Sequence, residues 1–263
     1  MTRTPNHIAA GSPKETKPKN QEIEMQTGLR IQPDTTADTQ TTRQPATRRD
    51  HMKLTVFGAT GGIGGHVVRQ ALAAGHHVTA VVRDPAQFDV SHPALEVATV
   101  PDLTDPESLR AALEGSDVAI SGVGPRGRKD GPVASSTTRG MLRAMEASGV
   151  RRFVAVSAVP VGPVPEGESF LNRRILLPLI SAVARDVYVD LGEMEDEIRR
   201  SATEWTIVRP PRLVNKPLTG EYRTVVGANV PRGYAISRAD VAHLMLAVMH
   251  NPATVRQAIG IAY

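Results

Sequence analysis

Hydrophobic residues follow two periods from Lys53 onward, because short runs rich in valine and isoleucine alternate with stretches in which apolar residues recur at helical spacing. The short runs predict strands at residues 54–57, 77–82, 95–100, 117–121, 152–157 and 204–210, and a last strand at 259–263. The helical stretches predict helices at 67–74, 134–148, 189–201 and 239–249, and a loop is expected from the double proline to Ala235. Strands and helices in this order are typical of an α/β fold with a doubly wound parallel sheet. About 210 residues suit a single domain of this kind.

Two segments depart from the pattern. Residues 158–186 contain four prolines and an apolar stretch at 175–180, which we interpret as a small apolar cap over a pocket; a core helix at 176–183 is the alternative. Residues 1–51 are rich in threonine, proline, glutamine, lysine and arginine and predict a disordered tail without a function. An overextended reading frame upstream of Met52 is the other interpretation of this stretch. The folded domain is expected at residues 52–263.

Composition excludes several kinds of site. Cysteine is absent from the 263 residues, which rules out disulfides, zinc–thiolate sites, iron–sulfur clusters and a cysteine nucleophile. The eight histidines show no ligand spacing, so no metal is expected. Beyond residue 51 the chain carries 23 Lys and Arg against 21 Asp and Glu, a balance that gives no case for a nucleic-acid partner. No apolar stretch is long enough to span a bilayer, and no secretory or organellar signal is evident, so we expect a cytoplasmic protein without a membrane partner.

A glycine cluster between the first predicted strand and the first predicted helix carries the strongest chemical signal. It reads Gly58-Ala-Thr60-Gly61-Gly62-Ile63-Gly64. A strand-to-helix turn of this kind lets the backbone approach a pyrophosphate closely, and the helix N-terminus offers unpaired N–H groups and a partial positive charge. The spacing and its context predict a Rossmann-like dinucleotide site; a purely structural glycine turn is the alternative.

The tip of the second predicted strand indicates which dinucleotide binds. A carboxylate there would hold a ribose 2′-hydroxyl, whereas a guanidinium grips a 2′-phosphate with paired hydrogen bonds. The strand ends in Arg83 and therefore favours NADP(H) over NAD, although Asp84 follows directly and a solvated Arg–Asp turn is the alternative.

The carboxyl ends of the other strands supply further candidate contacts, because ligands of open α/β sheets bind outside those ends. Asp102 and Leu103 are expected at the adenine ring, and Ser121, Gly122 and Val123 at the start of the nicotinamide side. The basic loop 125–130 adds Arg126 as a candidate phosphate contact, with a solvated loop as the alternative for its other cations. Trp205, Met245 and Met249 are expected in the core.

These residues resemble the atypical short-chain dehydrogenase/reductases, in particular the NAD(P)H-binding group typified by biliverdin reductase B, also called flavin reductase. The resemblance covers residues 53–263. Its marks are the stretches 57–64 and 81–84, the strand ending in Ser157, Asp190 with Met194, Arg209-Pro-Pro211, and the stretches 217–222 and 236–240.

The resemblance implies a single-domain reductase that uses NADPH to reduce flavins or other planar conjugated acceptors, with Ser157 near the nicotinamide and Pro210 among the cofactor-binding residues. Many short-chain dehydrogenases protonate a carbonyl with a Tyr-x-x-x-Lys pair; here no lysine follows Tyr188 at that spacing, and by alignment the two positions are Val187 and Leu191. Arg212 stands where biliverdin-reductase-like relatives carry a histidine, and it could bind an anionic substrate or lie in a solvated loop.

The hypothesis from the sequence is therefore an NADP(H)-dependent oxidoreductase with a small-molecule substrate, Ser157 and Arg212 being its candidate catalytic residues. The glycine turn, Arg83 and the missing tyrosine–lysine pair support it together. A non-catalytic NAD(P)-sensing regulator of the NmrA type is the alternative from another class. An epimerase or reductase of the extended group is less compatible, because residues 212–235 are too few for a substrate domain. Monomer and homodimer both stay open.

Overall fold

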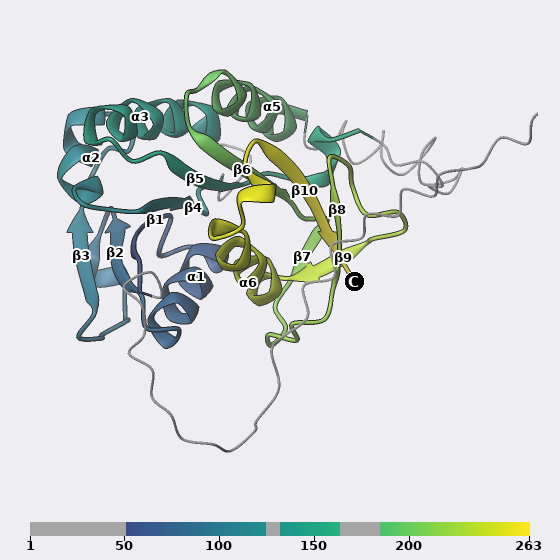
Figure 1. The fold of residues 1–263 in the computed structure, drawn as a ribbon, viewed down its shortest axis with the longest axis horizontal. Helices are drawn as coiled ribbons and strands as arrows, with labels where there is room; N and C mark the ends of the chain where they lie inside the picture. The colour runs from purple at the N-terminus through teal and green to yellow at the C-terminus, as the bar shows by residue number, and fades with distance from the viewer. Residues whose placement is uncertain (1–50, 125–131, 164–184) are drawn as a thin grey trace, which may run out of the picture.

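The computed structural model describes residues 51–124, 132–163 and 185–263. These residues form a main sheet of eight strands with helices on both of its faces (Figure 1). Apart from His51 the predicted tail lies outside the described residues, as do Arg126 and residues 164–184 of the predicted cap.

The main sheet has the strand order of a doubly wound fold. Its strands are β1 (Lys53–Phe57), β2 (His77–Val82), β3 (Leu95–Thr99), β4 (Val118–Ser121), β5 (Arg152–Val156), β6 (Glu204–Arg209), β8 (Arg223–Val226) and β10 (Gln257–Ala262). They lie in the order β3-β2-β1-β4-β5-β6-β10-β8, parallel throughout except that β8 pairs antiparallel with β10. The order reverses between β1 and β4, which is the topological switch point of a Rossmann-like sheet. The predicted fold class is confirmed.

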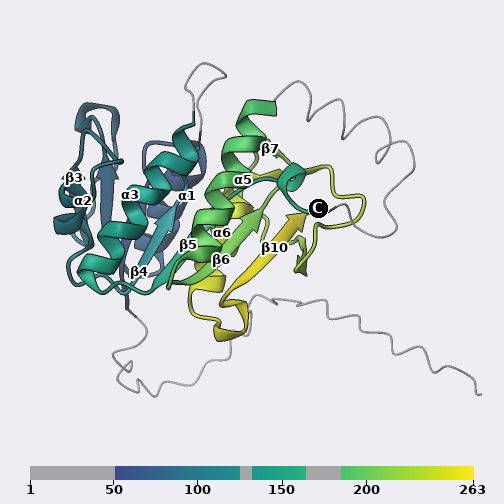
Figure 2. The ribbon, with the colours of Figure 1, turned by 90° about the horizontal axis from the view of Figure 1, so that it is seen from above.

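Helices cover the two faces of the sheet in separate layers (Figures 1 and 2). The helices α1 (Gly62–Ala73) and α6 (Arg238–Met249) pack against each other on one face. The helices α2 (Pro106–Leu113), α3 (Val133–Ser148) and α5 (Arg185–Arg200) form the other layer, with α3 between its neighbours. Within the described part of the chain, no helix is both long and apolar enough to span a lipid bilayer.

Two apolar clusters fill the space between the sheet and these layers. Because successive side chains of a strand point to opposite faces, Val56 joins the cluster under α1 and α6, whereas Phe57 joins the cluster under α2, α3 and α5. Trp205 lies in the second cluster and Met245 in the first, both buried, as predicted. Gly149 ends α3 with a φ of +73°, the left-handed cap that glycine adopts without strain.

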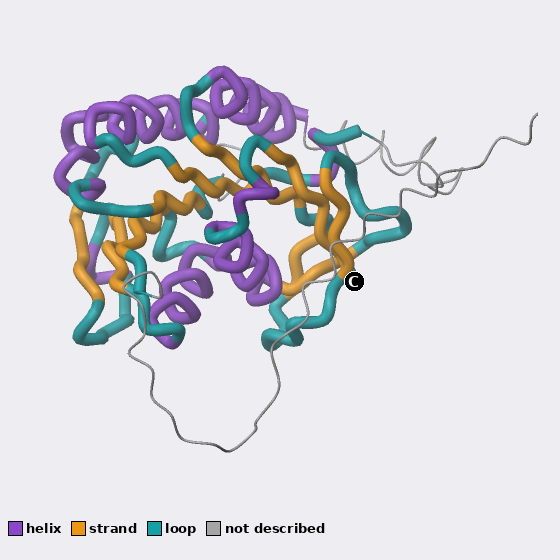
Figure 3. Tube along the Cα trace, viewed as in Figure 1, coloured by secondary structure: helices purple, strands orange, loops and turns teal. Residues whose placement is uncertain are grey.

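The structure differs from the sequence prediction in three places. Helix α2 is absent from the predicted elements, and α1 begins at Gly62 rather than near Val67. The expected loop up to Ala235 in fact contains β8 and the short strands β7 (Arg212–Val214) and β9 (Ala235–Ser237), which pair in parallel. Strands of three residues are too short to show a period, and this pairing joins residues more than twenty positions apart. Figure 3 shows these strands beside the loops that surround them.

A buried carboxylate ties the loop before β8 to the start of α6. Asp240 accepts hydrogen bonds from the backbone N–H groups of Thr219 and Gly220, both at 2.9 Å, and from the Tyr263 hydroxyl at 2.7 Å. The hydroxyl of Ser237 accepts from the Asp240 N–H at 2.9 Å and donates to its carboxylate at 2.6 Å, which caps the helix. The stretches 217–222 and 236–240 are thus held together by one residue.

Candidate functional site

A cleft of about 980 Å³ opens at the carboxyl ends of β1, β2, β4 and β5, at the switch point of the sheet. This is the place where open α/β sheets bind ligands. The structure brings many of the residues predicted from the sequence to its lining: Gly58, Thr60, Gly61, Gly62, Ile63, Arg83, Asp102, Leu103, Gly122, Val123 and Ser157.

The glycine turn is packed backbone against backbone. Gly58 has a φ of +72°, and a Cβ on Gly64 would lie 2.1 Å from the Gly58 carbonyl oxygen, so neither position tolerates a side chain. The first helical hydrogen bond of α1 runs from Gly65 N–H to the Gly61 oxygen at 2.9 Å. The amides before it have no intrahelical acceptor. Helix α1 has no side-chain cap and no acidic residue in its first turn, so its positive end faces the cleft unopposed by its own residues.

At the tip of β2 the arginine and the aspartate have separate positions. Arg83 is exposed and lines the cleft. Asp84 instead caps the short 3₁₀ helix at Pro85–Gln87, where its carboxylate accepts from the Ala86 N–H at 3.0 Å and the Gln87 amide at 2.9 Å. The guanidinium is therefore the charged group that β2 offers to a ligand.

The neighbouring wall of the cleft is formed by Asp102 and Leu103 after β3. The Thr104 hydroxyl and N–H donate to Asp102 Oδ1 at 2.7 and 2.8 Å and lower the pKa of this exposed carboxyl.

The opposite side of the cleft, at the end of β5, is largely apolar. Val187 and Leu191, the two positions where many relatives carry the tyrosine and the lysine, both line it, together with Val156. Tyr188 lines it as well, and burial raises the pKa of its phenol. No described element of this wall brings a lysine into the lining. The arrangement can hold a flat apolar ring, but it lacks the cation that would make a tyrosine acidic.

Ser157 provides the polar group of this wall. Its side chain is buried, and among the described residues its Oγ makes no hydrogen bond of normal geometry. Directly behind it, Arg209 donates from Nε and a terminal nitrogen to the Glu195 carboxylate at 2.9 and 2.6 Å. Burial by itself raises the pKa of Glu195, but the hydrogen bonds from Arg209, the neighbouring Ser157 hydroxyl and the positive charges of Arg209 and Arg199 hold that pKa below its usual range. The hydroxyl thus lies beside a carboxylate that Arg209 and Arg199 both pair, and it keeps hydrogen-bonding capacity for a ligand.

A second carboxylate positions the helices that carry this wall. Asp190 of α5 is buried and accepts from the N–H groups of Ala134 and Ser135 at 2.8 and 2.9 Å, in the first turn of α3. No residue of α3 itself caps this end with its side chain. One carboxylate therefore fixes α3 to α5 at the rim of the cleft.

Four predicted site residues do not line the cleft: Gly64, Ser121, Pro210 and Arg212. Gly64 and Ser121 are buried against the turn, where they act through packing. Arg212 is exposed on β7, and the next residue, Leu213, reaches the cleft instead, because adjacent strand residues face opposite sides. Arg126 lies outside the described residues.

Sequence reasoning missed Arg238 and Thr137, which also line the cleft. Arg238 follows the helix cap Ser237, but nothing local to the sequence indicates that α6 begins beside α1. Among the described residues, no group of His, Cys, Asp or Glu side chains could hold a metal ion.

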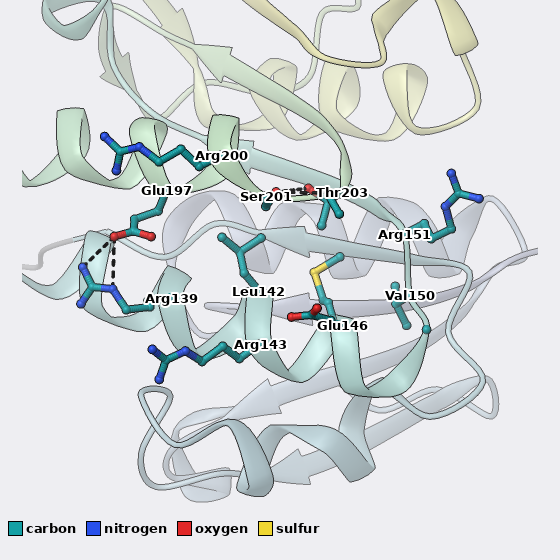
Figure 4. A pocket seen from close by; sticks show the side chains of 13 residues that line it. Arg139, Leu142, Arg143, Glu146, Val150, Arg151, Glu197, Arg200, Ser201 and Thr203 are labelled. Atoms are coloured by element: carbon teal, nitrogen blue, oxygen red, sulfur yellow. Dashed lines mark hydrogen bonds and ion pairs between the residues drawn. The ribbon is translucent and has the colours of Figure 1, made fainter.

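A second cleft of about 920 Å³ lies between the ends of α3 and α5, at the amino ends of β5 and β6 (Figure 4). Two of its arginines form ion pairs: Arg139 lies 3.0 Å from Glu197, and Arg151 lies 2.7 Å from Glu204. It lies at the end of the sheet opposite to the glycine turn, so we assign it no part in dinucleotide binding.

The switch-point cleft, the glycine turn and the strand order define a dinucleotide-binding protein of the Rossmann type. A family model described as NAD(P)H-binding matches residues 58–252, and the chain belongs to this family.

Sequence relatives cover parts of the chain. It is 30% identical over 176 residues to an uncharacterized chloroplastic protein of Arabidopsis thaliana, an alignment that covers 64% of this chain and 61% of that protein. It is 31% identical over 115 residues to the nitrogen metabolite regulation-like protein bik4 of Gibberella fujikuroi, covering 41% and 33% of the two chains. The chain thus spans less than two thirds of the length of these relatives.

Solved structures share the fold over most of the described chain. A short-chain dehydrogenase/reductase of Veillonella parvula in complex with NADP superposes with a TM-score of 0.67 at 19% identity, covering 81% of this chain and 94% of that one. A candidate NADH-flavin reductase of Streptococcus pneumoniae gives a TM-score of 0.64 at 22% identity and covers 80% and 99% of the two chains.

Proposed function

We propose that this protein is an NADPH-dependent reductase that passes a hydride to a flavin-like or other planar conjugated acceptor. The observation that carries the proposal is the apolar wall of Val187 and Leu191, which occupies the two positions of the usual proton-donating pair. A carbonyl substrate needs an acid at that place, whereas a flavin ring takes the hydride directly at N5 and then a proton from solvent.

The residues present fit such a cofactor. Gly61 and Gly62 of the glycine turn line the cleft without side chains, which lets a pyrophosphate approach the backbone closely. When bound, the dinucleotide supplies the hydride from its nicotinamide ring. The chain contributes orientation: the Ser157 hydroxyl holds the carboxamide or the acceptor, and the apolar side chains keep two stacked rings in contact and exclude water.

The preference for NADPH rests on Arg83. Its guanidinium is the charged group at the end of β2 that lines the cleft, and Asp84 is engaged in capping. A 2′-phosphate would find a bidentate partner there.

The test is anaerobic absorbance of the NADPH band with the purified full chain, adding riboflavin, FMN and FAD in turn against a blank without protein. Bleaching that saturates with flavin is expected. If the protein binds NADPH but the band bleaches no faster than in the blank at every flavin concentration, the proposed reductase activity is refuted.

The alternative function is an NAD(P)-sensing regulator without turnover. The similarity to the nitrogen metabolite regulation-like protein favours it, and so does the missing tyrosine–lysine pair. Tight binding of both the reduced and the oxidised cofactor, with no acceptor reduced, would support this alternative.

A further inference from the structure

Arg238 is a charged residue of the cleft to which the sequence analysis assigned no role. It is the first residue of α6, directly after the cap Ser237, and its half-buried side chain lines the cleft. The helix that carries it packs on α1, so the residue reaches the glycine turn from the far end of the chain.

The side chain lies across the first residue of α1. A Cβ built on Gly62 would come within 2.6 Å of Arg238 Cδ and 2.8 Å of its Nε. Glycine at position 62 therefore makes room for the arginine as well as for a ligand. The guanidinium lies next to the unpaired amides of the helix N-terminus, so two positive groups meet at one point.

One neutral partner fixes this position. Arg238 donates to the Asn215 side-chain oxygen at 2.7 Å, and among the described residues no carboxylate forms an ion pair with it. Its charge is felt on α1: the pKa of His66 is lowered first by burial and then by the positive charges of Arg69 and Arg238. An arginine held in place by an amide keeps its charge available to an anion.

We propose that Arg238 binds the pyrophosphate of the dinucleotide, as a clamp that closes over the glycine turn from α6. The proposal rests on the dinucleotide binding of the proposed function, but not on the identity of the acceptor. It assigns the two cleft arginines different tasks. Arg83 reads the 2′-phosphate, which only NADPH carries, whereas Arg238 binds the group that NADPH and NADH share.

This division predicts opposite patterns of cofactor discrimination. Arg238→Gln should weaken NADPH and NADH binding by the same factor, about tenfold, the size expected for one lost charge-assisted hydrogen bond. It should leave unchanged the dissociation constant of adenosine 2′-monophosphate, which lacks a pyrophosphate, as measured by its competition with NADPH. Arg83→Ser should weaken the binding of NADPH and of adenosine 2′-monophosphate and leave the binding of NADH unchanged.

The experiment is a fluorescence titration of the full chain with NADPH and with NADH, in the wild type and in each variant. Arg143→Gln is the matched control, since it removes one exposed arginine charge at the second cleft and should leave both dissociation constants unchanged. Arg238→Lys keeps the charge but not the planar fork and should give an intermediate loss. Asn215→Ala removes only the hydrogen bond that holds the arginine. It should weaken the binding of both cofactors by the same factor, smaller than that of Arg238→Gln, and it is the replacement test if Arg238→Gln does not fold.

The outcomes separate this proposal from the proposed function. Equal weakening of both cofactors by Arg238→Gln, with an unchanged thermal midpoint, supports the clamp. Unchanged binding of both overturns it, and a loss confined to NADPH overturns it in favour of a 2′-phosphate contact. If the wild type binds neither dinucleotide, the cofactor assignment itself fails, and the clamp fails with it.

Discussion

Replacing Gly64 by alanine tests the packing of the glycine turn. The new methyl carbon would lie 2.1 Å from the Gly58 carbonyl oxygen and 2.7 Å from its carbon, against an ordinary C···O contact of about 3.3 Å. Both groups belong to the backbone, so no side chain can turn away. Overpacking of this kind costs about 3 kcal/mol, and the helix preference of alanine returns about 1 kcal/mol. The net loss of about 2 kcal/mol lowers the melting temperature by roughly 4–8 °C.

Gly192→Ala is the matched control. Gly192 lies inside α5, and a Cβ there meets no atom within 4 Å. The same chemical change should raise the stability by about 0.5–1 kcal/mol. Thermal melts followed by circular dichroism and NADPH titrations of the three proteins give the comparison. Gly64→Ala should also weaken NADPH binding, because α1 must move away from the turn. If Gly64→Ala has the melting temperature of the wild type and binds NADPH equally well, the packing argument for the turn is wrong.

Three further predictions concern the walls of the cleft. Ser157→Ala should reduce flavin turnover about tenfold without lowering the unfolding free energy, because its hydroxyl makes no well-formed bond in the protein; a loss above about 1 kcal/mol in denaturant titrations would contradict this. Glu195→Gln should cost about 3–5 kcal/mol at neutral pH by removing the carboxylate that pairs the buried Arg209 and the partly exposed Arg199. Because the folded-state pKa of Glu195 lies below the ordinary value of 4.5, its stabilisation is complete above that pH and is lost as the pH falls toward the folded-state pKa. Urea titrations should therefore show that the difference in unfolding free energy between Glu195→Gln and the wild type becomes smaller in acid. A difference that does not change with pH would contradict the role given to the Glu195 carboxylate. Arg83→Ser should raise the NADPH dissociation constant at least tenfold and leave that of NADH unchanged, as measured by fluorescence; equal changes would remove the argument for NADP(H).

The strands and the glycine turn could be predicted because their signals are local. Short apolar runs mark β1 to β6, and the glycines Gly58, Gly61 and Gly64 that make the turn lie within seven residues of one another in the sequence. The boundary of α1 was missed because its first turn consists mostly of glycine, a poor helix former that the dinucleotide turn nevertheless requires.

The parts of the site that depend on tertiary contacts could not be predicted. On β7, Leu213 lines the cleft and Arg212 does not, and no local signal reports which face of a three-residue strand meets the cleft. Arg238 reaches Gly62 across 176 positions through the packing of α6 on α1. The engagement of Asp84 in a cap and the pairing of Glu195 with Arg209 are likewise visible only in the folded chain.

Single-turnover transfer from NADPH deuterated at C4 of the nicotinamide tests the central claim most directly. The full chain is mixed anaerobically with limiting FMN, and flavin bleaching is followed by stopped flow. The account predicts protein-dependent reduction of FMN that is slower with the deuterated cofactor, since the hydride passes directly from the nicotinamide to the flavin within the apolar wall. Bound NADPH that reduces FMN no faster than free NADPH, with no isotope effect, would contradict it.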